Sequence, residues 1–173
     1  MNEINKKNEK KDLTTNNKHF EKLLKICLII GIVIVSGFII YYILTPEPGY
    51  ATIGILNEEQ KAENYPTEAM VNETISFYIT VENQMEREFS FRIEILKGDN
   101  ETIVNSSGSI NALSYFNTTK TTLLHNQFWM SDSLNISFSQ PGAKQRIIVE
   151  LWEIKGEIEV FYNNLYLWLN ITN

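Results

Sequence analysis

The 173-residue chain is poor in the residue types that most often build catalytic and metal sites. It contains one Cys, two His and eight Gly. One Cys excludes a disulfide framework and a Cys-rich zinc site, and two His argue against a multi-histidine metal centre. Neither half of the chain is strongly basic, which argues against nucleic acid as a partner. We therefore expect no cofactor and no metal.

One uncharged apolar run dominates the sequence. Residues 26–44 contain no charged side chain, and as a helix they would extend for about 28 Å, close to the hydrocarbon thickness of a bilayer. The alternative is a cleaved signal peptide. Its N-terminal region would be unusually long, and Leu44-Thr45-Pro46 is not a small-x-small cleavage motif. We interpret the run as an uncleaved, single-pass transmembrane helix.

The charge distribution predicts the orientation of this helix. Residues 1–25 hold seven Lys and four acidic residues, a net charge of +3, whereas the rest of the chain has eight Lys and Arg and seventeen acidic residues, a net charge of −9. Positive flanks stay inside, so we expect residues 1–25 to be a disordered cytoplasmic tail and the C-terminal domain to be extracellular on a cell membrane.

Asn-x-Ser/Thr sequons provide a second, independent signal. Six occur, all after the apolar run, at Asn72, Asn100, Asn105, Asn117, Asn135 and Asn170. The motif is a glycan acceptor only on a secreted surface. The alternative is that turns rich in Asn and Thr produce sequons by chance. We predict a glycoprotein, with Asn72 and Asn100 the favoured sites.

Beyond a linker at residues 45–49, the hydrophobic period changes to two, which is typical of β-strands. Residues 75–82 and 89–95 alternate clearly, and the short segment between them predicts an antiparallel hairpin. Turn signals recur every 8 to 12 residues, with Gly156 at one of them. Seven to nine strands over residues 50–173 indicate a mainly β fold, an immunoglobulin-like antiparallel β-sandwich preceded by the transmembrane helix.

Two groups of short patterns resemble a known family. The first is Ile53-Gly54-Ile55-Leu56 followed by Tyr65-Pro66-Thr67, and the second is Ile148-Val149-Glu150-Leu151-Trp152 followed by Tyr166-Leu167-Trp168-Leu169. Over roughly residues 50–172 the chain resembles DUF1616, a domain of unknown function found on archaeal membrane proteins. The resemblance implies an archaeal host and a sandwich but brings no activity. From its own residues, Tyr65-Pro66 is interpreted as a structural corner, with the Tyr65 hydroxyl bonded to backbone.

Catalytic chemistry has few candidates. His125 is the only His outside the tail, and no nucleophile-elbow motif surrounds a Ser. Acidic residues near the C-terminus alternate along strands, as expected for a solvated face of a sheet; they are Glu150, Glu153, Glu157 and Glu159. We expect that the protein is not an enzyme.

Aromatic residues of the last strands are the one constellation with a plausible binding role. Trp152, Tyr166 and Trp168 occupy the positions opposite the regular apolar ones, and Tyr162 is expected in the connection between the strands. Rigid aromatics on a sheet face suit stacking against sugars or a partner protein. The alternative is that this face packs inside the domain.

The sequence therefore predicts a membrane-anchored cell-surface protein whose glycosylated sandwich is a non-enzymatic interaction or structural module. Its partners would be the lipid bilayer and other envelope proteins or surface glycans. Two alternatives remain: an accessory subunit of a membrane transport or glycan-assembly complex, and a carbohydrate-active enzyme with paired carboxylates.

Overall fold

The computed structural model describes residues 3–45 and 49–173 of the chain, with side chains from residue 20 onward. It separates into an N-terminal unit, residues 1–47, and a C-terminal unit, residues 48–173. Each is described by itself. Residues 46–48 of the expected linker lie outside the described part.

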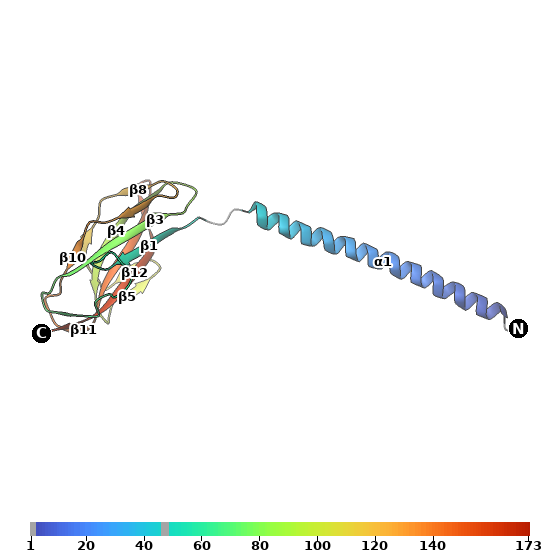
Figure 1. Cartoon of the computed structure of the whole chain (residues 1–173), viewed down its shortest axis with the longest axis horizontal. Coiled ribbons are helices and arrows are strands. Elements are labelled where there is room, and N and C mark those ends of the chain that lie inside the picture. Colours follow the sequence, from blue (N-terminus) through green and yellow to red (C-terminus); the bar gives the residue numbers. More distant parts are fainter. Residues whose placement is uncertain (1–2, 46–48) are drawn as a thin grey trace. The chain divides into compact units, whose positions relative to one another are not determined.

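The N-terminal unit is one helix, α1 (Glu3–Leu44) (Figure 1). We expected disorder before residue 26, but the helix already begins at Glu3. Lys and Glu are good helix formers, no Gly or Pro precedes Gly31, and a helix once nucleated in the apolar segment propagates readily. Its C-terminal part, Phe20–Leu44, contains an 18-residue window with a mean hydropathy of 2.8 that is not buried, so it is long and apolar enough to cross a membrane.

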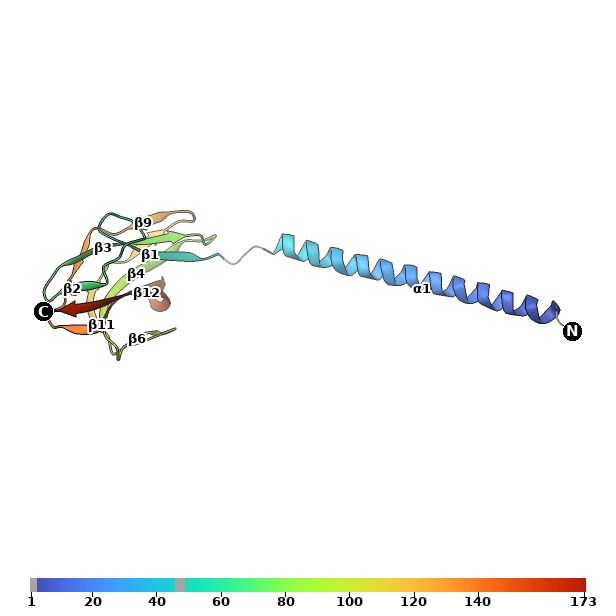
Figure 2. The ribbon, with the colours of Figure 1, turned by 60° about the horizontal axis from the view of Figure 1, so that its bottom comes forward.

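The C-terminal unit is a sandwich of two sheets, seen in Figure 1 and from another side in Figure 2. The smaller sheet has the order β1-β3-β10, with β9 also paired to β3. Its strands are β1 (Ala51–Leu56), β3 (Ile75–Asn83), β9 (Phe128–Met130) and β10 (Leu134–Ile136). The mainly β, immunoglobulin-like fold class predicted from the period-two pattern is confirmed.

The larger sheet has the order β2-β12-β11-β4-β7, with β8 also paired to β4. Its strands are β2 (Glu68–Met70), β4 (Phe89–Gly98), β7 (Leu113–Asn117), β8 (Thr121–Leu123), β11 (Gly142–Lys155) and β12 (Ile158–Thr172). A separate hairpin, β5 (Ile103–Asn105) with β6 (Gly108–Ile110), lies in the connection from β4 to β7. The described residues thus contain twelve strands, more than the seven to nine expected, because several are only three residues long.

The core lies between the two sheets. Strand β3 turns Phe77, Ile79 and Val81 inward, and β4 turns Phe91 and Ile93 inward from the opposite sheet, all at 2% exposure or less. Alternation along each strand is what allows every second residue to reach the shared core while the others meet solvent.

The predicted hairpin between residues 75–82 and 89–95 is wrong, because β3 and β4 belong to different sheets. The short connection crosses from one sheet to the other. Asn83 fixes this crossing: its side-chain Nδ2 donates to the carbonyls of Arg87, at 2.8 Å, and Leu123, at 2.9 Å. Its Oδ1 accepts the N–H of Met85 at 2.8 Å. Alternation alone could not distinguish a hairpin from a crossover, since both bury the same residues.

Candidate interaction surface

Three of the four predicted aromatic residues share the outer face of the larger sheet. Strands β11 and β12 pair antiparallel, with Arg146 opposite Trp168 and Ile148 opposite Tyr166. Directly opposite residues of an antiparallel pair point to the same face, and so do residues two apart on one strand. Trp152, six residues after Arg146 on β11, therefore faces the same way as Tyr166 and Trp168.

Tyr162 does not belong to this face. It lies within β12, where the pairing with β11 shifts by one residue between Leu151 and Trp152. Such a bulge redirects a side chain. The Tyr162 ring packs edge-on against Phe89 at 5.2 Å between centroids, and its hydroxyl accepts the N–H of Ala51 at 2.8 Å. The expected place of Tyr162, in a connection and on the patch, is corrected: it lies against the core.

The exposed part of the outer face is a cluster of Arg146, Tyr166 and Trp168, called here the aromatic shelf. Trp168 and Tyr166 are 42% and 45% exposed, and their rings meet edge to face at 5.8 Å. The guanidinium carbon of Arg146 lies 3.9 Å from the centroid of the Trp168 ring and 5.7 Å from that of Tyr166. The cation holds both aromatic rings in place while leaving part of each in solvent.

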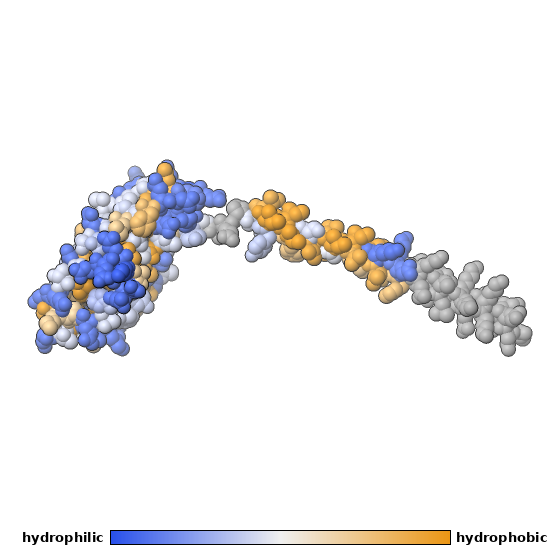
Figure 3. Space-filling model, viewed as in Figure 1, coloured by the Kyte–Doolittle hydropathy of each residue, from blue (hydrophilic) through white to orange (hydrophobic). Residues whose placement is uncertain are grey.

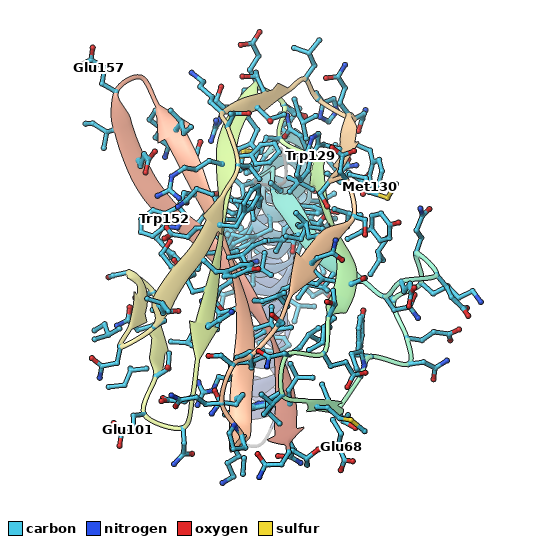
Figure 4. All side chains as sticks on the ribbon, turned by 90° about the vertical axis from the view of Figure 1, so that its left-hand side faces the viewer. Glu68, Glu101, Trp129, Met130, Trp152 and Glu157 are labelled. Carbon is cyan, nitrogen blue, oxygen red and sulfur yellow. The ribbon has the colours of Figure 1, made fainter. Side chains whose placement is uncertain are left out.

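Trp152 is in a different situation, since the β5–β6 hairpin lies over it. A Cβ at Gly108, whose φ is +107°, would come within 3.2 Å of the Trp152 ring. Figure 4 shows Trp152 close to this hairpin and separated from Trp129 of the smaller sheet. The Trp152 ring also packs edge to face against Phe161, with 5.5 Å between ring centroids, and the guanidinium carbon of Arg92 lies 5.2 Å from the centroid of the Trp152 ring. Trp152 is thus half-buried and serves mainly as packing for the hairpin.

The expectation of a solvated acidic face is wrong for two of its four residues. Glu150 is 2% exposed; its carboxylate accepts the N–H of Ser109 at 2.6 Å and the indole N–H of Trp152 at 3.1 Å. Glu153 is 3% exposed and pairs with Arg87 at 2.6 Å and Lys155 at 3.1 Å. Buried carboxylates need such donors, and sequence alternation does not reveal the hairpin and side chains that supply them.

Glu157 and Glu159, in contrast, are exposed as expected. Glu157 stands at the tip of the β11–β12 hairpin in Figure 4, beside Gly156, whose φ of +67° makes the predicted turn. Glu159 accepts from Arg92 at 2.8 Å, and this hydrogen bond holds the pKa of Glu159 below its ordinary value.

The sequon asparagines all reach the surface. Asn105 is partly exposed, and the other five are exposed: Asn72, Asn100, Asn117, Asn135 and Asn170. Asn135 and Asn170 alternate with the buried residues of their strands, as the sequence predicts. Asn72 and Asn100 lie in turns. Their use as glycan acceptors stays a prediction.

Two further residues behave as structural elements. The Tyr65 hydroxyl donates to the carbonyl of Ile55 at 2.6 Å, so the interpretation of Tyr65-Pro66 as a corner is confirmed. His125 lies in an exposed turn, with Nδ1 2.7 Å from the carbonyl oxygen of Met85. Among the side chains that the structure describes, those of residues 20–45 and 49–173, no three His, Cys, Asp or Glu gather as metal ligands would.

Sequence reasoning missed Arg146 and the position of the β5–β6 hairpin over Trp152. Arg146 could have been found, because it shares the period-two positions of Trp152 on β11. The hairpin carries no comparable signal: its strands have three residues each, too few to show a period.

The fold and the surface together define a β-sandwich domain preceded by an apolar helix that could anchor it in a membrane. Residues 44–170 match the family described as "Domain of unknown function (DUF1616)", and the chain belongs to this family. The resemblance seen in the sequence patterns is thereby confirmed. A search of curated proteins finds no match.

Solved structures with a similar chain path include a CARDB domain from Pyrococcus furiosus, crystallised in complex with di-metal ions. It has 15% identity and a TM-score of 0.46, and the alignment covers 75% of this chain and 93% of that domain. A solution NMR structure of a CARDB domain from the same organism has 14% identity and a TM-score of 0.47, covering 73% and 98%. A β-glucosidase from Listeria innocua has 9% identity and a TM-score of 0.43, covering 72% of this chain and 16% of the enzyme.

Proposed function

We propose that this protein is a single-pass membrane protein that holds its sandwich outside the cell membrane. Two observations support the anchor. Residues 26–44 of the helix carry no charged side chain, and Figure 3 shows a mostly orange, hydrophobic surface there, with the charged residues gathered toward the N-terminal end of Phe20–Leu44. The net charge changes from +3 before residue 26 to −9 after residue 25, which favours a cytoplasmic N-terminus.

On the outside, the sandwich is a glycoprotein domain. All six sequons belong to it, and every one of the six asparagines is at least partly exposed. A glycan is large and strongly hydrated, so it is tolerated only where the side chain already meets solvent.

The sandwich acts there as a non-enzymatic interaction module, and the aromatic shelf is the observation that carries this proposal. Exposed Trp, Tyr and Arg are the residues that contribute most to binding surfaces, and the two rigid aromatic types combine a large contact area with a small loss of conformational entropy. The cation–aromatic contacts already order Trp168 and Tyr166 before any partner binds. A glycosidase would need exposed carboxylates, but Glu150 and Glu153 are buried. Their carboxylates form hydrogen bonds and ion pairs within the fold.

Partners of this surface are other envelope proteins or surface glycans close to the lipid bilayer. A photo-crosslinking amino acid in place of Tyr166 tests the proposal in native membranes. The matched control position is Phe128, which is 60% exposed but lies on β9 of the other sheet. We expect discrete crosslinked adducts from position 166, weakened by Arg146→Ala, and none from position 128. Equal adducts from both positions, or none from either, would contradict a role for the shelf.

A further inference from the structure

Trp168 borders a hollow beside the edge of the larger sheet. The hollow has a volume of about 360 Å³ and is lined by Thr67, Asn100, Lys144, Trp168, Leu169 and Asn170. Its origin is a register irregularity in the β11–β12 pairing between Gly142 and Gln145. Two residues of β11 bulge out there, opposite Asn170, and the backbone N–H of Lys144 donates to Asn170 Oδ1 at 3.2 Å.

A sequon asparagine and a tryptophan are neighbours on this surface. In Trp168-Leu169-Asn170-Ile171-Thr172, Leu169 and Ile171 are buried at 1% and 4% exposure, so Trp168 and Asn170 both point outward. Two residues on one face of a strand are separated by roughly 7 Å. The contact with Lys144 uses Oδ1 of Asn170 and leaves Nδ2, the atom that a glycan would modify.

We propose that Asn170 carries an N-linked glycan whose first sugar stacks on the exposed part of the Trp168 ring and fills this hollow. This inference rests on the proposed extracellular placement of the sandwich. It identifies the first sugar of the Asn170 glycan as a ligand of Trp168 in the aromatic shelf. The apolar C–H face of a pyranose suits the electron-rich face of an indole, and a ligand tethered two residues away acts at high effective concentration. The glycan then forms one edge of the surface that a partner meets at Tyr166.

The modification itself is a group transfer from a lipid-linked oligosaccharide of the host membrane. Asn170 Nδ2 forms a bond to C1 of the sugar, the bond from C1 to the lipid phosphate breaks, and the phosphate leaves with the electron pair of that bond. The Asn170 amide loses one proton in the step, and this proton passes to water.

A second sequon provides a matched control inside the same chain. Asn117 also has an aromatic residue, Tyr115, two positions earlier. There a bulge between β4 and β7 separates the two side chains. The Tyr115 hydroxyl donates to the carbonyl of Asn135 at 3.2 Å, whereas Asn117 Oδ1 accepts from Arg92 at 2.8 Å. Sequence spacing is therefore the same, but stacking of a glycan on Tyr115 is not expected.

The test uses the full-length protein purified in detergent from cells that glycosylate it. Glycopeptide mass spectrometry first determines the occupancy of each sequon. Thermal melts then compare wild type, Trp168→Ala, Asn170→Gln and the double variant. We expect Trp168→Ala to lower Tm by about 3 °C more when the Asn170 glycan is present than in the Asn170→Gln background. In the control pair, the changes in Tm caused by Tyr115→Ala and Asn117→Gln should be additive in the double variant.

A measurement that needs no variant gives independent evidence. Ring-current shifts should move the proton resonances of the first sugar on Asn170 upfield in the intact glycoprotein. An unmodified Asn170, additive melts, or coupling of Trp168 to Asn100→Gln in place of Asn170→Gln would overturn the inference. If other sequons are modified in that case, the extracellular placement still stands; if none is modified, the glycoprotein proposal fails with it.

Discussion

The indole N–H of Trp152 donates to the carboxylate of Glu150 at 3.1 Å, and both residues lie under the β5–β6 hairpin. The same carboxylate accepts the backbone N–H of Ser109 from the hairpin itself. Glu150 thus joins the hairpin to the sheet, and Trp152 packs beneath it. The outer face of the sheet divides into a covered part at Trp152 and an exposed part at Trp168.

Alanine substitutions should separate these two parts. Trp152→Ala should lower the free energy of unfolding by about 2 to 3 kcal/mol, because it removes packing under the hairpin and a hydrogen-bond donor. Trp168→Ala in unglycosylated protein should cost less than about 1 kcal/mol, as is usual for exposed side chains. Thermal melts of the two full-length variants check this; equal losses, whether both large or both small, would contradict the division of the face into a covered and an exposed part.

Glu150→Ala should release the β5–β6 hairpin. The substitution leaves the Ser109 N–H and the Trp152 indole N–H without their acceptor, and each unpaired donor should lower the free energy of unfolding by about 1 kcal/mol or more. Hydrogen exchange at the Ser109 amide should then become at least about tenfold faster. Glu157→Ala, at the exposed tip of the β11–β12 hairpin, is the control and should leave exchange in the β5–β6 hairpin unchanged.

Asn83→Ala should be among the most destabilising polar substitutions in the sandwich. The side chain is fully buried and makes three hydrogen bonds that hold the crossing from β3 to β4. Losing them should reduce the free energy of unfolding by about 3 kcal/mol, since the buried carbonyl of Leu123 and the buried N–H of Met85 remain unpaired. Denaturant unfolding measures the loss. Gln84→Ala, next along the chain but only half-buried, should cost under about 1 kcal/mol.

Tyr65 should make stability depend on alkaline pH. Burial raises the pKa of Tyr65 above its ordinary value of 10.0. Because the pKa of Tyr65 is higher in the folded state than in the unfolded state, the protonated hydroxyl contributes fully to stability below about pH 10. This contribution is lost as the pH rises through the folded-state pKa. Tyr65→Phe should cost about 1 kcal/mol at neutral pH through loss of the bond to Ile55.

The difference in unfolding free energy between wild type and Tyr65→Phe should therefore shrink above pH 10. A constant difference between wild type and Tyr65→Phe across the alkaline range would contradict the assigned role of the Tyr65 hydroxyl.

Local sequence patterns predict those parts of the fold that depend on local geometry. Gly156 supplies the positive φ of the β11–β12 turn, and the alternation of β12 correctly places Trp168 and Asn170 outward. The rest depends on contacts between distant segments. The crossing of β3 to β4 is held by an Asn83 contact with Leu123, forty residues away.

The candidate surface shows the same division. Alternation correctly groups Tyr166 and Trp168, but a single-residue bulge turns Tyr162 into the core, and an alternating pattern gives no sign of it. The burial of Glu150 depends on a hairpin more than forty residues earlier in the chain. Such long-range coverage decides which positions of a sheet face remain free to bind.

Labelling of single cysteines with a membrane-impermeant maleimide on intact cells tests the central claim most directly. With Cys27 replaced by Ser, one new cysteine is placed at Lys120, which is exposed on the sandwich, or at Asn16 before the apolar run. We predict that Lys120→Cys is labelled on intact cells and that Asn16→Cys is labelled only after lysis. Labelling of Asn16→Cys on intact cells, with Lys120→Cys protected until lysis, would place the sandwich in the cytoplasm and contradict the account.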